Sequence, residues 1–390
     1  MLKFIQTVLS VGAIAFLLYI FTFFMDGEMG MILIAFMVVA PAVSLFFTAY
    51  SRKRVKVSFK CDAYVQKGSE LEITVKIEKT GRLPLPVVEI TPWASEVFEK
   101  QSKIYRSSLL TENTREFSFR VKAKTGGNGT VGIKSLYCCG FLGFLKLRAK
   151  TALPEDASVG VIPEIPDVKA ASQLFRKIAD VVLTSDEEEA SNTAMLFSSN
   201  TSPGYEYREY VNGDSLKRVN WKLSTKRDTL MVRMDEAAAS VQPMIVLDLF
   251  RKKGAAPEYA VITEEKLLRG VFGLLNLLVK QGIACNFIYK GGNGEPVMES
   301  VDNPDYPAQL LLKVLAVKVT EEYRNVPVIT GKSVCAGIVA TTDAGPGIAA
   351  VTAKFEDPDS VSILGVSAES LNSTGLPMWY LTDDDNFELV

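Results

Sequence analysis

Two uninterrupted apolar runs open the chain. Residues 4–25 and residues 29–50 each hold 22 residues without a charged side chain. Because a helix rises about 1.5 Å per residue, each run is long enough to cross a hydrocarbon core of about 30 Å. Only Asp26, Gly27 and Glu28 separate the two runs. The pattern predicts a transmembrane helical hairpin over residues 1–54, with Pro41 as a kink that lipid tolerates.

The charges that flank these runs predict an orientation. Lys3 precedes the first run, and five basic residues follow the second before any acid: Arg52, Lys53, Arg54, Lys56 and Lys60. By the positive-inside rule we expect a multi-pass protein of the cell membrane whose termini and soluble domains are cytoplasmic. A cleaved signal peptide is the alternative for the first run, and the second run argues against it. The basic residues also suit anionic lipid, although a topology signal alone accounts for them.

From residue 55 to residue 150, apolar and polar positions alternate with period two. The alternation is unbroken over residues 71–78, 116–124 and 131–136, and glycine-containing turns separate these stretches. Short strands that each have one apolar face predict a β-sandwich domain. Its sequence contains no constellation of catalytic residues, so we expect a spacer or docking module.

Residues 151–241 have a mixed pattern and are predicted to connect two domains. We expect a strand at 159–163, a helix at 169–183 and an acidic, solvated linker at 184–200. A metal site at the acidic residues 186–189 is the alternative, although consecutive carboxylates on a flexible loop are usually solvated.

Beyond residue 242 the pattern alternates between buried strands and amphipathic helices. Helices are predicted at 259–281, closed by Gly282, and at 306–319. Strands are predicted at 243–249, 284–289, 333–340, 361–366 and 378–381. Repeated strand–helix units of this length predict a parallel, doubly wound sheet over residues 242–390.

Composition narrows the chemistry. The 390 residues include no histidine, which excludes Ser-His-Asp, Cys-His and histidine-based zinc sites within this chain. Lys and Arg (43) nearly balance Asp and Glu (45), which argues against a nucleic-acid partner. Five cysteines, of which Cys138 and Cys139 are adjacent, are interpreted as reduced packing residues. We therefore expect a protein that is not an enzyme and that has no cofactor.

Residues 208–233 concentrate polar groups of specific kinds. Residues 212–214, Asn-Gly-Asp, are predicted to form a turn into a helix, with Asp214 as its N-cap. Leu216, Val219 and Leu223 then share one helical face. The guanidinium groups of two flanking residues, Arg208 and Arg218, can reach the turn, which predicts a partly buried ion network.

Ten residues of this segment resemble the signature of the family known as domain of unknown function 58. They are Arg208, Glu209, Tyr210, Gly213, Asp214, Arg218, Trp221, Lys222, Thr225 and Lys226. The order of two N-terminal spans, a β-rich domain ending in Gly-Phe-Leu-Gly-Phe-Leu (140–145), the signature and an α/β domain is similar to the family over nearly the whole chain.

The resemblance implies a C-terminal domain similar to the von Willebrand factor A fold. It also implies partners: a MoxR-type AAA+ ATPase and membrane proteins, often transglutaminase-like ones. It implies no settled enzymatic activity. Asn220 stands where relatives often have Asp or His, so no proton-transfer role is assigned to it.

A metal site is implied by the von Willebrand factor A fold, whose first strand is followed by Asp-x-Ser-x-Ser. Here that loop, residues 248–252, reads Asp-Leu-Phe-Arg-Lys, and both hydroxyl ligands are replaced. Asp343 is the candidate for the distant carboxylate. A hard cation needs about six oxygen ligands. Asp248 and Asp343 are therefore candidates only for a degenerate site, and we expect no bound metal.

Three functions remain in competition. The first is a membrane-anchored interaction or scaffold protein in envelope or complex assembly, in which the signature, with Trp221 and its arginines as anchors, docks a partner. A purely structural alternative is that Asp214 caps a helix, the arginines neutralise it and Trp221 packs between domains. The second function is a hydrolase or nuclease with a metal held by Asp214 and Glu209, which the surrounding positive charge opposes. The third is metal-dependent adhesion, which the altered loop opposes.

Overall fold

The structure is a computed structural model, and it describes most of the chain. The described residues are 11–20, 23, 27–81, 83–141, 143, 146–170, 172–182, 201–210, 219–227, 229–237, 242–251, 254–319, 336–355, 361–367 and 375–390. They divide into two compact units, Met1–Ile162 and Pro163–Val390.

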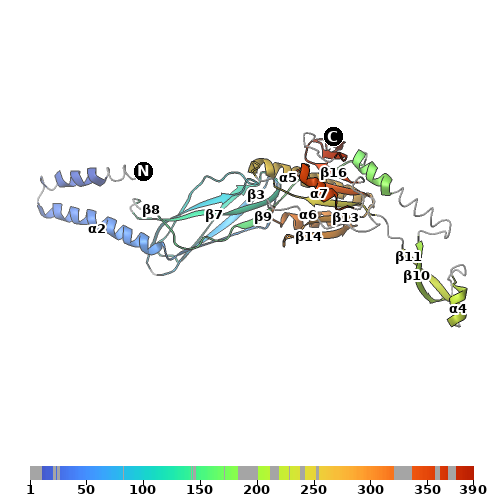
Figure 1. Ribbon diagram of the computed structural model, residues 1–390. Coiled ribbons are helices and arrows are strands. Elements are labelled where there is room, and N and C mark those ends of the chain that lie inside the picture. The colour runs from blue at the N-terminus through green and yellow to red at the C-terminus, as the bar shows by residue number, and fades with distance from the viewer. Residues whose placement is uncertain are drawn as a thin grey trace. The chain divides into compact units, whose positions relative to one another are not determined.

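The first unit begins with a long apolar helix, α2 (Gly27–Ser51), which contains Pro41 (Figure 1). Its segment Gly30–Ser51 is apolar and long enough to cross a membrane, in the place where the second span was predicted. The first predicted span is described as a shorter helix, Val11–Ile20. Residues 1–10 are not among the described residues, so the transmembrane helical hairpin stays a prediction.

The remainder of the first unit is a β-sandwich. Its smaller sheet has the order β1–β3–β6 and is antiparallel. Its larger sheet has the order β2–β9–β7–β4–β5, with β8 paired to β7. The strands are β1 (Val55–Cys61), β2 (Tyr64–Gln66), β3 (Glu70–Lys79), β4 (Leu85–Ala94), β5 (Tyr105–Leu109), β6 (Thr114–Lys122), β7 (Gly127–Cys139), β8 (Lys146–Arg148) and β9 (Ala157–Ile162).

The period-two pattern explains how this sandwich is held together. In β3, alternate residues are buried: Leu71, Ile73, Val75 and Ile77. Removing such side chains from water stabilises the fold by about 1.5–3 kcal/mol each. The sandwich reaches further than residue 150, because β9 pairs with both β7 and β2.

The second unit contains a seven-stranded sheet with the order β14–β13–β12–β15–β16–β17–β18. The five central strands are parallel, and β14 and β18 are antiparallel edges. The strands are β12 (Met244–Asp248), β13 (Cys285–Lys290), β14 (Pro296–Val301), β15 (Gly337–Thr341), β16 (Ser362–Gly365), β17 (Met378–Leu381) and β18 (Phe387–Leu389). The parallel core agrees with the sequence; the two edge strands were not predicted.

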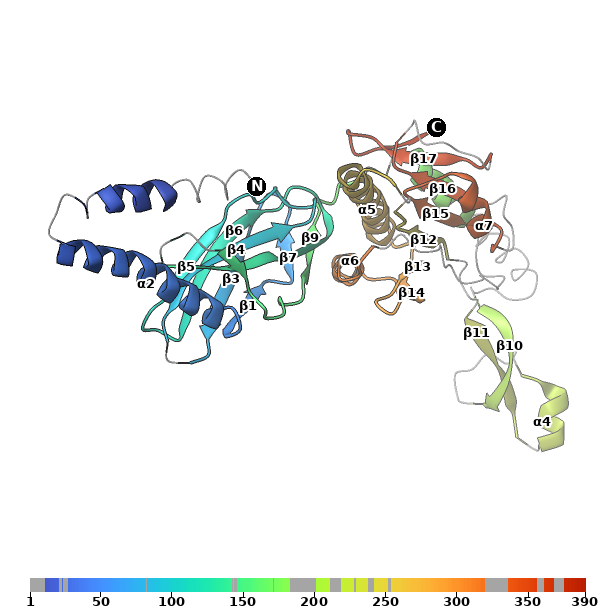
Figure 2. The same ribbon diagram turned by 60° about the vertical axis from the view of Figure 1, so that its left-hand side comes forward.

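Helices cover both faces of this sheet (Figure 2). On one face α5 (Pro257–Lys280) packs against β13, β15, β16 and β17, and α6 (Tyr306–Leu315) packs against α5. On the other face, η2 (Pro346–Ile348) and α7 (Ala349–Thr352) contribute Ile348 and Val351 to a buried cluster with Val246 and Val339. A sheet buried on both faces explains why its strands are continuously apolar.

A separate two-stranded sheet carries part of the polar segment. β10 (Thr201–Glu209) and β11 (Met231–Ala237) are antiparallel, and the short helix α4 (Trp221–Arg227) lies between them in sequence and contacts β11. Apolar and polar residues alternate over residues 229–235, a pattern typical of a strand that agrees with β11, whereas β10 was not predicted.

Candidate functional site

The strands β10 and β11 position the described part of the signature. Arg208 pairs with Val232 and Glu209 with Met231 in the strand register. The amide of Tyr210 donates a hydrogen bond to the carbonyl oxygen of Leu230 over 2.7 Å. Gly213, Asp214 and Arg218 lie outside the described residues, as does the side chain of Arg208, so the predicted ion network stays a prediction.

The helix that carries Leu223 begins later than predicted. Val219 is buried, as expected, but it forms a β-bridge with Val232 and is not part of the helix. Asn220 is the N-cap of α4, because its Oδ1 atom accepts a hydrogen bond from the amide of Leu223 over 3.1 Å. Asn is among the residues that best satisfy the free amides of a first helical turn. The capping hydrogen bond explains why asparagine suits position 220, which the sequence alone did not show.

Helix α4 presents an exposed aromatic side chain among cations. Trp221 is 62% exposed. Lys222, Lys226 and Arg227 of the same helix are exposed as well. The inner side of α4 is fixed by Ser224, whose buried hydroxyl accepts a hydrogen bond from the Met231 amide over 2.8 Å. The helix is therefore anchored to β11 by one side while its tryptophan faces outward.

A second group of polar residues lies at the carboxyl ends of β12 and β15. Asp248 and Thr341 are paired in the strand register, and both side chains are buried. The hydroxyl of Thr341 donates to Asp248 Oδ2 over 2.9 Å and accepts from the Asp343 amide over 3.2 Å. Asp343 Oδ1 in turn accepts from the amide of Gly345 over 3.0 Å. Thr341 thus links the carboxylate of Asp248 to the backbone of Asp343.

These residues do not fit a hard divalent cation. Where the von Willebrand factor A loop has hydroxyls, this chain has Phe250 and Lys252. Arg251, between them, donates two hydrogen bonds to the carboxylate of Glu264 in α5: from Nε to Oε1, and from Nη2 to Oε2 over 2.9 Å. Within the described ranges no group of three or more Cys, Asp or Glu side chains is arranged to hold a metal. The loop is better explained as a hydrogen-bonded junction than as a metal centre.

A third polar cluster joins β13, β14 and α6 around one carboxylate. Glu299 accepts hydrogen bonds from the hydroxyl groups of Tyr289, over 2.8 Å, and Tyr306, and from Lys313 Nζ over 2.7 Å. Burial raises the pKa of Glu299, but the hydrogen bonds from Lys313 and the two tyrosines outweigh it, so the pKa lies below its ordinary value. Burial, with the bond to Glu299, raises the pKa of Tyr289 to about 12. Glu299 is therefore ionised at neutral pH and accepts hydrogen bonds from Tyr289, Tyr306 and Lys313.

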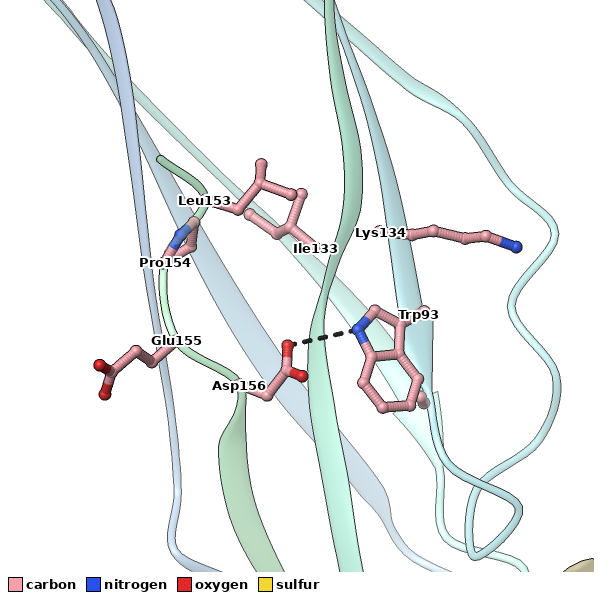
Figure 3. A pocket seen from close by; sticks show the side chains of 8 residues that line it. Trp93, Ile133, Lys134, Leu153, Pro154, Glu155 and Asp156 are labelled. Carbon is pink, nitrogen blue, oxygen red and sulfur yellow. Dashed lines mark hydrogen bonds between the residues drawn. The ribbon is translucent and has the colours of Figure 1, made fainter. Parts of the chain in front are cut away.

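An open groove of about 630 Å³ lies on the β-sandwich. Trp93 Nε1 donates a hydrogen bond to Asp156 Oδ1 over 3.3 Å. Figure 3 shows these two side chains pointing toward each other, while Lys134 and Glu155 point away. Gly132 makes the pair possible, because a Cβ atom there would lie 1.9 Å from Asp156 Oδ1. The groove is shallow and lacks a second converging polar group, so it does not define a reaction.

The described cysteines are free thiols, as predicted. Burial raises the pKa of both the Cys138 and the Cys285 thiol to about 12. Since the thiolate is the nucleophile, neither group is reactive at neutral pH.

In a comparison with known proteins, one part of the chain matches a family model. Residues 206–260, which include the end of β10, α4, β11 and β12, match the family described as "Protein of unknown function DUF58". No curated protein matches the chain.

Solved structures match only about a third of the chain. A cohesin module from a Clostridium perfringens family 33 glycoside hydrolase is 15% identical, with a TM-score of 0.24, over 29% of this chain and 99% of that one. A CARDB domain from Pyrococcus furiosus is 14% identical, with a TM-score of 0.22, over 28% and 94%. A fragment of Escherichia coli alpha-2-macroglobulin is 18% identical, with a TM-score of 0.23, over 30% and 18%. Similarities at this level carry no functional argument.

Proposed function

We propose that this chain, whose residues 206–260 match the DUF58 family, is a membrane-anchored interaction protein. In this proposal, α2 and a second span hold the chain in the cell membrane, and the soluble units face the cytoplasm. The β10–α4–β11 segment docks a MoxR-type AAA+ ATPase during envelope or complex assembly. The partner class rests on the family resemblance.

The exposed position of Trp221 is the observation that carries the proposal. An indole that is 62% exposed leaves apolar surface in water, and covering it with a partner recovers that free energy. Tryptophan and arginine dominate the binding energy of many protein interfaces. In the structural alternative, Trp221 packs between domains and not against a partner.

The charges around Trp221 indicate what the partner surface contains. Lys222, Lys226 and Arg227 place three cations on a helix of seven residues. Facing charges of opposite sign accelerate association and exclude wrong partners. We therefore expect an acidic surface on the ATPase with an apolar pocket for the indole.

The α/β body supports the same proposal as a non-catalytic frame. Its strand order, with parallel central strands and an antiparallel β14 edge, fits assignment to the von Willebrand factor A type. In that assignment Asp248, Thr341 and Asp343 occupy the ligand edge. Because they bond to one another and to backbone amides, binding through a metal is disfavoured.

A titration of the full-length, detergent-solubilised chain with a purified MoxR-type ATPase tests the proposal. Trp221→Ala is expected to weaken binding by about thirtyfold or more, since truncation of such an anchor costs about 2 kcal/mol or more. Lys226→Glu is expected to slow association and to reduce its salt dependence.

The matched control is Tyr259→Ala. Tyr259 lies in the first turn of α5 and is 64% exposed. The substitution therefore removes a comparably exposed aromatic side chain from the same unit. Equal affinities of the Trp221 and Tyr259 variants would reject α4 as the docking surface. No binding by the wild-type chain, with ATP or ADP, would reject the partner class.

A further inference from the structure

The end of α2 is not a free linker but is packed onto the β-sandwich. α2 contacts β4, β7 and β8. Its polar residues Ser44, Thr48 and Ser51 are buried although they are near the end of the apolar segment. Successive residues of this set lie four and three positions apart, so they share one helical face. That face is covered by the sandwich, whereas Leu45 and Phe46 remain exposed.

The loop that follows β7 makes the closest contact with this face. A Cβ atom at Gly140 would lie 2.6 Å from Ser44 Oγ, so only glycine lets the loop backbone approach the helix this closely. The next residue, Phe141, packs edge-on against Phe47 with ring centroids 5.6 Å apart. Phe141 nevertheless remains 47% exposed. An aromatic ring held beside the helix and still about half exposed leaves apolar surface available for a further contact.

The position of Phe47 along α2 indicates what that contact is. Gly30–Ser51 contains 22 residues and is about 33 Å long, slightly more than a hydrocarbon core of about 30 Å. Phe47 precedes the end of this segment by four residues, or about 6 Å. A ring packed on Phe47 therefore lies at the boundary between acyl chains and headgroups, where aromatic side chains are enriched.

Other side chains fit the same boundary. The ring of Tyr50 lies under the guanidinium group of Arg54, 4.3 Å from ring centroid to Cζ. Arg54 and Lys146, at the start of β8, are exposed, and Lys146 also forms an ion pair with the buried Glu89 carboxylate. Aromatic rings at one level and cations just beyond it match the order of acyl chains and phosphates in a bilayer.

We propose that the β7–β8 loop is a second membrane contact, in which Phe141 inserts beside α2 into the interfacial layer of the bilayer and holds the β-sandwich against the membrane. The proposal rests on the membrane anchoring in the proposed function. It adds that the occupant of this surface is phospholipid. Because the inserted group is apolar, the contact is insensitive to salt.

Depth-dependent quenching in liposomes tests this proposal. The full chain, with its native cysteines replaced by alanine, carries a single cysteine labelled with the fluorophore NBD in each of three variants: Phe141→Cys, Phe36→Cys and Tyr64→Cys. The vesicles contain phosphatidylcholine and phosphatidylglycerol, with spin-labelled lipid either at the headgroup or in mid-chain. Circular dichroism verifies the fold of each labelled variant.

Each labelled position reports a different depth relative to the bilayer. Phe36 lies in the middle of α2 and is exposed, so it tests the anchor itself. Tyr64 pairs with Gly160, which pairs with Asn128 at the opposite end of β7 from Cys139. Tyr64 is exposed and lies roughly 35 Å along the sheet from the β7–β8 loop.

We expect the label at 141 to be quenched about twofold by shallow spin label, equally at low and high salt, and the label at 64 to be unquenched. The label at 36 is expected to be quenched by mid-chain spin label. Quenching at 36 without quenching at 141, or quenching at 141 that disappears in high salt, overturns the inference and leaves the proposed function intact. Absence of quenching at 36 overturns the anchoring on which both depend.

Discussion

At α4, one amide side chain joins an extended backbone to a helix. Asn220 donates its own backbone amide to the Met231 carbonyl over 2.9 Å, and its carbonyl and side-chain oxygens receive the first free amides of α4. The orientation of Trp221 depends on this junction. A helix of seven residues has little stability of its own, because nucleation is costly.

Replacing this cap is therefore expected to disturb recognition without touching the recognised residue. Asn220→Ala should cost about 1 kcal/mol of local stability, whereas Asn220→Asp should retain the cap. Hydrogen exchange at the Leu223 and Ser224 amides of the full chain, together with the ATPase titration, measures both effects. If the Ala and Asp variants exchange and bind alike, Asn220 is not the residue that fixes α4.

At the scale of single residues, the sequence identified candidate site residues better than it predicted which side chains contact each other. Asp248 and Asp343 were recognised as candidates, and their strands do bring them to one edge, because parallel strands end together. The pairing of Arg251 with Glu264 was not predictable, since the direction of the loop after β12 depends on where α5 packs. The groove at Trp93 was missed for a similar reason, as Asp156 reaches it only once β9 has joined the sheet.

Among the elements, strong periodicity was the reliable signal. The alternation over residues 71–78 lies within β3, and the strand predicted at 378–381 is β17. β14 was missed because its exposed edge dilutes the apolar pattern. The turn-forming residues Gly291, Gly292, Asn293 and Gly294 between it and β13 were the signal that would have revealed the hairpin.

The Glu299 cluster ties that hairpin to α6, and its stability is expected to depend on pH. A carboxyl group whose pKa is lowered by folding stabilises the protein above its ordinary pKa, which is 4.5. That stabilisation is lost as the pH falls through the lower, folded-state pKa. Glu299→Gln should therefore lower the melting temperature by a few degrees at pH 7, and the difference from wild type should shrink below pH 4.5.

Scanning calorimetry of the solubilised chain between pH 3 and pH 7 measures this difference. The control is Glu388→Gln, at an exposed carboxylate of β18 that accepts a hydrogen bond from Tyr380 over 3.0 Å. It should have a smaller effect, because an exposed pair is screened by water. A Glu299 variant whose deficit stays constant across the pH range would show that the cluster is not stabilised by ionisation.

At the scale of the whole molecule, the main prediction to test is the orientation of the chain in the membrane. The basic residues after α2 predict that both soluble units face the cytoplasm. Proteinase K added to intact cells should leave them undigested, whereas inverted membrane vesicles should expose them. An epitope tag before residue 1 should be protected in the same way if the first apolar run spans the membrane.

Two outcomes would contradict this expectation in different ways. Digestion of the soluble units from outside would reverse the orientation and remove the cytoplasmic ATPase as a partner. Digestion of the N-terminal tag alone would leave α2 as a single span. The sequence predicts the hairpin from length and charge, and the described part of the first helix is too short to decide between one and two spans.

The close packing of the sandwich on Ser44, Thr48 and Gly140 has a mechanical consequence. A spanning helix tilts to match the thickness of its bilayer, and a body clamped to its last turns must tilt with it. With α2 anchored as proposed, the helix and the sandwich would act as a lever that converts a change of a few ångströms in lipid thickness into a swing of the distant tip at Tyr64. Measuring that swing in bilayers of short and long acyl chains would reveal whether the protein senses the membrane that holds it.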